Sequence, residues 1–197
     1  MVSSQVSLPA LILLILTSLQ LLLGRSWRLV LVALAAQYLG VFIFICMSWT
    51  VKLALAKLIS GWMACVLLLV AVGNSSEPMH EKASPSGRLF RLLAACLIAI
   101  TIIASTRNMR LWLPEVELIL VLPSLVLISM GLLHLSLTRL PLRAILAMLT
   151  MLSGFEILYA AVEGSVMVAG FLAGITLGMA MVGAYLITAP DLEREST

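Results

Sequence analysis

The chain has few charged residues. Lys, Arg, Asp and Glu make up 11% of its 197 residues, against about 25% in a typical soluble protein. Aromatic residues are also scarce, at 6%. Together with a mean hydropathy of +1.18, this composition excludes an ordinary water-soluble globule and predicts a protein of the lipid bilayer.

Sequence signatures of catalytic or metal chemistry are missing. There is no Gly-rich phosphate loop, no paired metal ligands and no nucleophile with a base. Cys46, Cys65 and Cys96 lie in apolar segments without CxxC spacing, so we assign them to helix packing. We expect no catalytic site in this chain and no cofactor bound by it. The net charge of +3 comes from residues in loops, so we expect no nucleic-acid partner.

The first residues do not resemble a cleaved signal peptide. Met1-Val2-Ser3-Ser4-Gln5 contains no Lys or Arg, and no A-x-A-like site follows the Leu-rich run. We therefore expect the first apolar run to remain in the protein as a helix.

Long apolar runs are what the sequence has in abundance. A bilayer offers no water to the backbone, so only helices or closed barrels can span it. The runs are about 20 residues long, which suits a helix across a core of about 30 Å, and they lack the period of two residues that a barrel needs. We predict an all-α polytopic membrane protein with about seven transmembrane helices. The predicted helices cover residues 8–23, 27–47, 49–72, 89–105, 116–137, 142–162 and 166–187.

A polar stretch rich in turn residues, 74–87, divides the sequence. It predicts a cytoplasmic loop between a three-helix unit, 1–73, and a four-helix unit, 88–188, followed by a tail, 189–197. The fourth run is the shortest, so six spans remain an alternative.

Basic residues predict the orientation. In a seven-helix arrangement, eight fall on one side: Arg25, Arg28, Lys82, Arg88, Arg91, Arg139, Arg143 and Arg194. The other side holds Arg107, Arg110 and, near its edge, Lys52. Because positive charge gathers in cytoplasmic loops, we expect the N-terminus outside and the C-terminus in the cytoplasm.

Two charged residues, Glu156 and Lys57, lie inside apolar runs. A charge at the middle of a membrane helix costs about 2.5–3.5 kcal/mol, so such a residue is usually paired or functional. Lys57 lies roughly 12 Å and Glu156 roughly 10 Å from the outer edge of its predicted helix. This similar depth permits an ion pair. A protonated or water-linked Glu156 remains an alternative, as does a Lys57 that extends to the interface.

Other polar and small residues are weaker candidates. Glu163 follows Glu156 by seven residues on the same helical face and is either interfacial or a point where protons enter or leave. His134, near the cytoplasmic end of its helix, is either hydrogen-bonded or part of a proton relay. The spacing of Gly170, Gly174 and Gly178 predicts a helix-packing face, with a hinge or a substrate groove as the alternative.

The chain resembles membrane subunits of respiratory complexes. A basic loop with Arg139 and Arg143, followed by Gly154-Phe155-Glu156-Ile157-Leu158, is similar to subunit K of NADH–quinone oxidoreductase (complex I). The whole chain looks more like the longer hydrogenase-4 component E. That likeness rests on Leu16-Thr17-Ser18-Leu19, on Arg25-Ser26-Trp27-Arg28 and on Lys57.

The resemblance implies a core subunit of an ion-pumping complex in a bacterial or archaeal plasma membrane, next to antiporter-like subunits. Glu156, and with it Lys57, would then belong to a path of intramembrane polar residues that passes protons. The K family carries a second glutamate in its last helix, whereas Gly174-Ile175-Thr176-Leu177-Gly178 here has no acid. A structural subunit of a respiratory or photosynthetic complex, or an independent small transporter, therefore remains an alternative.

Overall fold

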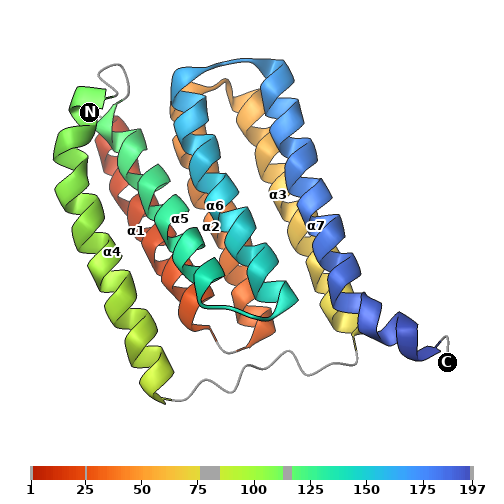
Figure 1. The fold of residues 1–197 in the computed structure, drawn as a ribbon. Helices are drawn as coiled ribbons and strands as arrows, with labels where there is room; N and C mark the ends of the chain where they lie inside the picture. Colours follow the sequence, from red (N-terminus) through yellow and green to blue (C-terminus); the bar gives the residue numbers. More distant parts are fainter. Residues whose placement is uncertain (1, 25, 76–84, 113–116, 196–197) are drawn as a thin grey trace.

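The computed structural model describes residues 2–24, 26–75, 85–112 and 117–195, and these ranges contain helices and no strand. The described ranges contain seven helices, which follow one another in sequence (Figure 1). They are α1 (Val2–Leu23), α2 (Trp27–Ser48), α3 (Val51–Asn74), α4 (Pro85–Trp112), α5 (Leu118–Ser136), α6 (Pro141–Val162) and α7 (Val166–Glu195). Each predicted apolar run lies on one of these helices, so the predicted all-α fold is confirmed.

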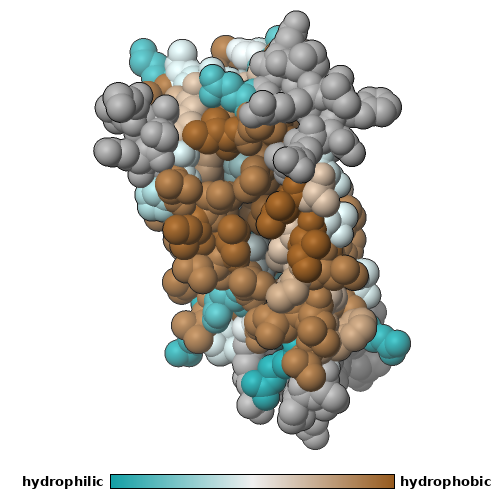
Figure 2. Space-filling view, turned by 90° about the vertical axis from the view of Figure 1, so that its left-hand side faces the viewer, coloured by the Kyte–Doolittle hydropathy of each residue, from teal (hydrophilic) through white to brown (hydrophobic). Residues whose placement is uncertain are grey.

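The helices have the length and composition of membrane spans. Helices α2 to α7 each contain a stretch of 19 to 24 residues that is apolar enough to cross a bilayer, and α1 contributes a shorter apolar stretch, Ser7–Leu23. Figure 2 shows the hydrophobic band that results, with hydrophilic residues toward both ends of the molecule. The protein is therefore a multi-pass membrane protein in its architecture.

Three boundaries differ from the prediction. The loop predicted at 74–87 is helical at both described ends, because Asn74 ends α3 and α4 begins at Pro85; residues 76–84 lie outside the described part of the chain. Proline suits the first turn of a helix, where its missing N–H has no partner to lose. Helix α7 also continues into the predicted tail, as far as Glu195. The segment Leu192-Glu193-Arg194-Glu195 consists of good helix formers.

The helices pack as two layers of three. Helices α1, α2 and α3 form one layer, and α5, α6 and α7 form the other, with α1 against α5, α2 against α6 and α3 against α7 (Figure 1). Helix α4 lies outside the layers, against α5 and more weakly against α1. The polar stretch that divides the sequence thus does not divide the packing, and the first three helices bury their apolar faces on the last three.

Glycines let α5 and α6 approach closely. A Cβ on Gly131 would lie 2.7 Å from the backbone nitrogen of Met151, and one on Gly154 would lie 2.7 Å from the backbone oxygen of Ser124. The predicted packing strip, Gly170, Gly174 and Gly178, is exposed instead, and a Cβ there would meet nothing within 4 Å. Inside the bundle, the tight contacts therefore fall at other glycines, and the strip lies on the outer side of α7.

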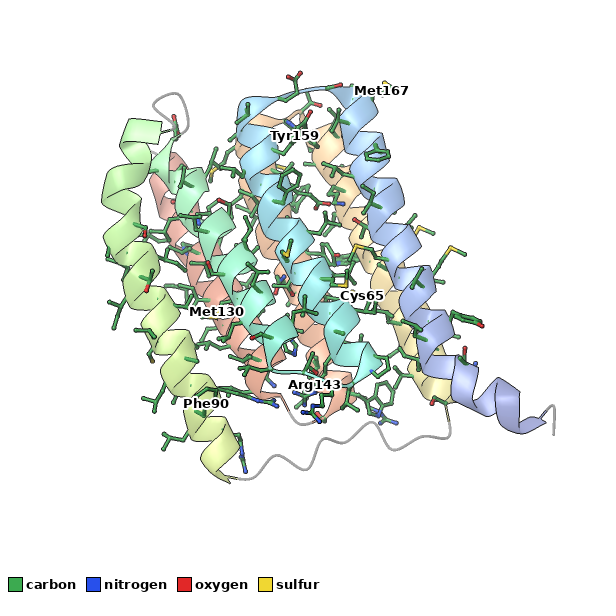
Figure 3. All side chains as sticks on the ribbon, in the orientation of Figure 1. Cys65, Phe90, Met130, Arg143, Tyr159 and Met167 are labelled. Atoms are coloured by element: carbon green, nitrogen blue, oxygen red, sulfur yellow. The ribbon has the colours of Figure 1, made fainter. Side chains whose placement is uncertain are left out.

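Basic residues stabilise helix ends at one end of the bundle. Arg143 donates a hydrogen bond to the backbone oxygen of Gly24 at 2.7 Å, just past the end of α1. Arg91 donates to the backbone oxygens of Leu22 and Leu137, each at 3.5 Å, at the ends of α1 and α5. Cations favour the negative carboxyl end of a helix. Figure 3 shows Arg143 at this end and Tyr159 and Met167 at the other.

Valine at Gly131 or Gly154 should destabilise the fold. Each added side chain would meet backbone atoms of the neighbouring helix, and overpacking of this kind costs about 1–3 kcal/mol. We expect Gly131→Val and Gly154→Val to lower the midpoint temperature of the detergent-solubilised protein, followed by intrinsic tryptophan fluorescence. Gly174→Val is the matched control, because it places the same side chain in a helix facing open space. An equal fall in midpoint temperature in all three variants would mean that the loss comes from the low helix propensity of valine and not from the close α5–α6 contact.

Candidate functional site

An ion pair joins two helices inside the apolar core. Lys57 of α3 and Glu156 of α6 form a salt bridge between Nζ and Oε1, and their side chains are only 4% and 1% exposed. Both residues lie within stretches long and apolar enough to span a membrane. The ion pair that their similar depth permitted is therefore formed, and Lys57 does not extend to the interface.

A third helix completes the site through Thr176. The ammonium of Lys57 donates hydrogen bonds to Thr176 Oγ1 at 2.6 Å and to the backbone oxygen of Leu172 at 3.3 Å. The Thr176 hydroxyl lies 3.4 Å from Glu156 Oε1 and 2.9 Å from the Leu172 oxygen. Because a hydroxyl carries one proton, Thr176 can donate to only one of these acceptors at a time. Thr176 thus accepts from the lysine and can donate to the carboxylate.

The local sequence explains why α3 and α7 come close enough for these contacts. Helix α7 buries a narrow stripe at helical spacing: Ala169, Leu172, Thr176, Ala180, Gly183 and Ile187. On α3, Ala54 and Ser60, about one turn to either side of Lys57, are small and buried. Small residues permit close helix approach in a membrane, and the approach places the backbone of α7 within reach of the lysine.

The second oxygen of the Glu156 carboxylate, Oε2, takes no part in these contacts. Glu156 Oε2 is buried and has no hydrogen-bond partner among the described residues. An unsatisfied buried acceptor costs about 1–3 kcal/mol, and a bound water would satisfy it. The site therefore combines an ion-paired oxygen with a second oxygen that has no partner among the described residues.

Tyr38 of α2 packs beside the pair. Its ring lies on Gly61, where a Cβ would come 2.5 Å from ring atom Cδ1. Tyr38 is buried, with only 2% of its surface exposed. The neighbouring Gln37 is also buried, and neither polar atom of its side chain has a partner among the described residues. Helix α2 thus contains two buried polar side chains, Gln37 and Tyr38.

Glu163 lies at the end of α6, away from the pair. It is exposed, and with Glu117 it lines a pocket of about 350 Å³ where α6 turns into α7. Trp49 fixes this turn, because its Nε1 donates to the Glu163 backbone oxygen at 2.8 Å. Ala160, one helical turn beyond Glu156, also lines the pocket. The pocket therefore begins about one turn above the buried carboxylate.

His134 belongs to a different part of the bundle. It is buried, two residues before the end of α5, whereas Glu156 lies fifteen residues after the start of α6. The two helices are joined at these ends, so the histidine and the glutamate are separated by about 20 Å along the bundle. The structure thus brings Lys57 and Glu156 together and leaves His134 apart from them.

Sequence reasoning missed Thr176. A threonine in an apolar helix usually bonds to its own backbone, and Thr176 does so, which gives no sequence signal of a further role. The only hint was its position in the stretch of the last helix that lacks the second acid of subunit K. Among the described residues, no group of three His, Cys, Asp or Glu side chains is close enough to hold a metal ion.

Comparison with known proteins adds no relative. No protein-family model matches the chain, and no curated protein or solved structure matches it either. The likeness to complex I subunit K and hydrogenase-4 component E therefore remains a hypothesis drawn from the sequence.

Removing one partner of the ion pair should destabilise the protein more than removing both. A single buried charge left without its partner costs about 3–5 kcal/mol, whereas an apolar pair of similar size is often neutral. We expect Lys57→Met and Glu156→Met each to lower the midpoint of thermal unfolding, and the double variant to recover most of the loss. Lys52→Met, at an exposed lysine of the same helix, is the control. A double variant that shows the sum of both losses would mean that the two charges do not interact.

Proposed function

We propose that this chain is a membrane subunit of a multi-subunit, ion-translocating oxidoreductase of the complex I or membrane-hydrogenase type, and that it relays protons through Lys57, Glu156 and Thr176. The observation that carries the proposal is the buried ion pair bridged by a hydroxyl group from a third helix. The resemblance seen in the sequence would also place Glu156 in a proton path, and Lys57 is the residue that lies against it.

The energetic cost of the site supports a role beyond stability. Two charges are expensive to bury, and apolar residues of similar volume often stabilise a protein as well or better. Ionisable residues inside membrane helices commonly mark ion pathways and proton relays. A chain that needed only to hold α3, α6 and α7 together could do so with the small and aliphatic residues that surround the pair.

The geometry supplies a route for a proton. The Lys57 ammonium can pass a proton to the Thr176 oxygen while the Thr176 hydroxyl passes its own proton to Glu156 Oε1, leaving a neutral amine and a neutral acid. The first contact is 2.6 Å and the second 3.4 Å, so a slight shortening of the second brings both within the range for proton transfer. Charge is conserved, and the reverse transfer restores the ion pair.

Exchange with the surface would occur through the pocket beside Glu163. Glu117 and Glu163 lend this pocket negative charge, which attracts protons and other cations. Glu163 lies seven residues from Glu156, about 10 Å along the helix axis. A few waters can cover this distance. Glu163 then serves as the point where protons enter or leave.

The assembly that we propose places the chain in a bacterial or archaeal plasma membrane, with its N-terminus outside and its C-terminus in the cytoplasm. Its neighbours are antiporter-like and other membrane subunits, together with lipid. The outer side of α7 supports contact with another subunit, because Gly170, Gly174 and Gly178 leave room for a second helix to approach.

A structural subunit without an ion path is the second candidate. The ion pair and Thr176 connect α3, α6 and α7 at one point, and such a connection can fix the arrangement of helices without moving protons. The two candidates predict different rates of proton translocation for a variant in which the Glu156 charge is removed and the shape of its side chain is kept.

Glu156→Gln should strongly reduce proton translocation and leave the protein able to assemble. The amide keeps the shape of the acid and its oxygen still accepts a hydrogen bond from Lys57, so this variant should lose less stability than Glu156→Met. The amide cannot take up a proton, and proton-transfer groups typically contribute about 10²–10⁴-fold. We expect redox-driven acidification of inverted membrane vesicles, followed by a pH-sensitive dye, to fall by about a hundredfold. The tagged chain purified in mild detergent should retain the same partner subunits as the unmodified protein.

Two controls accompany this experiment: the Glu163→Gln variant, and a transport measurement on the purified chain without other subunits. Glu163→Gln should only slow translocation, since Glu163 is exposed and other groups of the pocket can replace it. Unchanged translocation in Glu156→Gln would favour the structural subunit. Ion transport by the purified chain alone in liposomes, with no subunits copurifying, would favour an independent transporter.

Thr176 should need its hydroxyl group. Thr176→Ser keeps the oxygen that accepts from Lys57, whereas Thr176→Val has nearly the same shape without it. We expect the serine variant to retain translocation and the valine variant to lose at least tenfold, within the range for a proton-transfer group. Equal rates in the two variants would show that protons pass directly between Lys57 and Glu156.

A further inference from the structure

A groove between α2 and α3 is separate from the proton site. It has a volume of about 440 Å³ and is lined by Trp27, Arg28, Leu31, Val32 and Ala35 of α2 and by Trp62, Cys65, Val66 and Leu69 of α3. None of these residues is Lys57, Glu156 or Thr176. The walls are apolar apart from Arg28, so the groove suits a hydrocarbon ligand with one negatively charged group.

The groove runs from the basic end of the bundle toward its middle. Arg28 lies at the start of α2, at the same end as Arg143, and Trp62 closes the inner end through a hydrogen bond from its Nε1 to the Ala35 backbone oxygen at 3.3 Å. From Arg28 to Ala35 the helix rises by about 10 Å. One leaflet of hydrocarbon is about 15 Å deep, half of the bilayer core. The groove therefore spans most of one leaflet.

The walls face the lipid. Val32, Val66 and Leu69 are 64%, 56% and 46% exposed, so the groove is open along its side. A single flexible hydrocarbon chain can therefore lie along it.

Arg28 supplies the charge at the mouth. Its guanidinium lies over the Trp27 ring, 5.2 Å from the centroid, and this contact holds the side chain at the rim. Arg28 is exposed, and no carboxylate of the described residues pairs with it. Its donors are therefore available to a phosphate, which guanidinium groups bind with paired hydrogen bonds.

We propose that this groove binds one acyl chain of an anionic phospholipid, whose phosphate contacts Arg28. An exposed arginine at the mouth of an apolar groove that spans most of one leaflet fits this ligand, and basic sites between transmembrane helices are known to bind such head groups. Trp27 at the rim lies where tryptophan is favoured at the membrane interface.

Tryptophan quenching by brominated lipids tests the proposal. With Trp112→Phe as the background and Trp49 buried in the bundle, quenching reports mainly on Trp27 and Trp62. The protein is placed in phosphatidylcholine vesicles that contain equal small fractions of either dibrominated phosphatidylglycerol or dibrominated phosphatidylcholine. We expect the anionic lipid to quench at about fivefold lower mole fraction, the preference that one basic residue contributes near a membrane surface.

Matched variants locate the site. Arg28→Gln should abolish the preference for phosphatidylglycerol, and Arg28→Lys should retain part of it. Arg139→Gln, at an exposed arginine at the same end of the bundle that does not line the groove, should leave it unchanged. Val66→Phe, which narrows the groove, should weaken quenching by both lipids. Equal quenching by the two lipids in the parent protein would overturn the proposal. So would an equal loss in the Arg28→Gln and Arg139→Gln variants, since the preference would then belong to the whole basic end.

Discussion

The attraction between one buried lysine and one buried glutamate governs the centre of this protein. Neither charge is tolerable in the apolar core without the other. Because Lys57 is on α3 and Glu156 is on α6, the need to pair them fixes how the two layers of helices meet. Thr176 then ties α7 to the same point through its contact with the lysine. The proposed proton site is thus also a polar contact that joins three helices.

Other contacts hold the helices in positions that allow the ion pair to form. Glycines at positions 131 and 154 bring α5 and α6 together, and small residues on α3 let α7 approach Lys57. Arginines at one end stabilise the ends of α1 and α5. The two ends of the molecule thus differ in chemistry: one carries arginines and the lipid-facing groove, and the other carries the pocket lined by Glu117 and Glu163.

Much of the fold could be predicted, because the length of an apolar run is a direct measure of a membrane span. Depth along a helix also follows from residue counting, which is why Lys57 and Glu156 could be matched. Residue counting does not show which face of a helix points toward the other helices. Gly170, Gly174 and Gly178 have the spacing of a packing face but lie on the outer side of α7. Polar composition likewise predicted a loop at 74–87, although both of its described ends are helical.

The sequence by itself determined that the chain is helical, that it has the character of a membrane protein, and that two opposite charges lie at similar depth. These properties depend on local composition and on the fixed rise of a helix. Only the tertiary structure decided that the charges meet, that Thr176 lies between them, and that His134 is about 20 Å away along the bundle. Such outcomes depend on how the helices are rotated and which of them are neighbours, and these are set by packing between residues far apart in the chain.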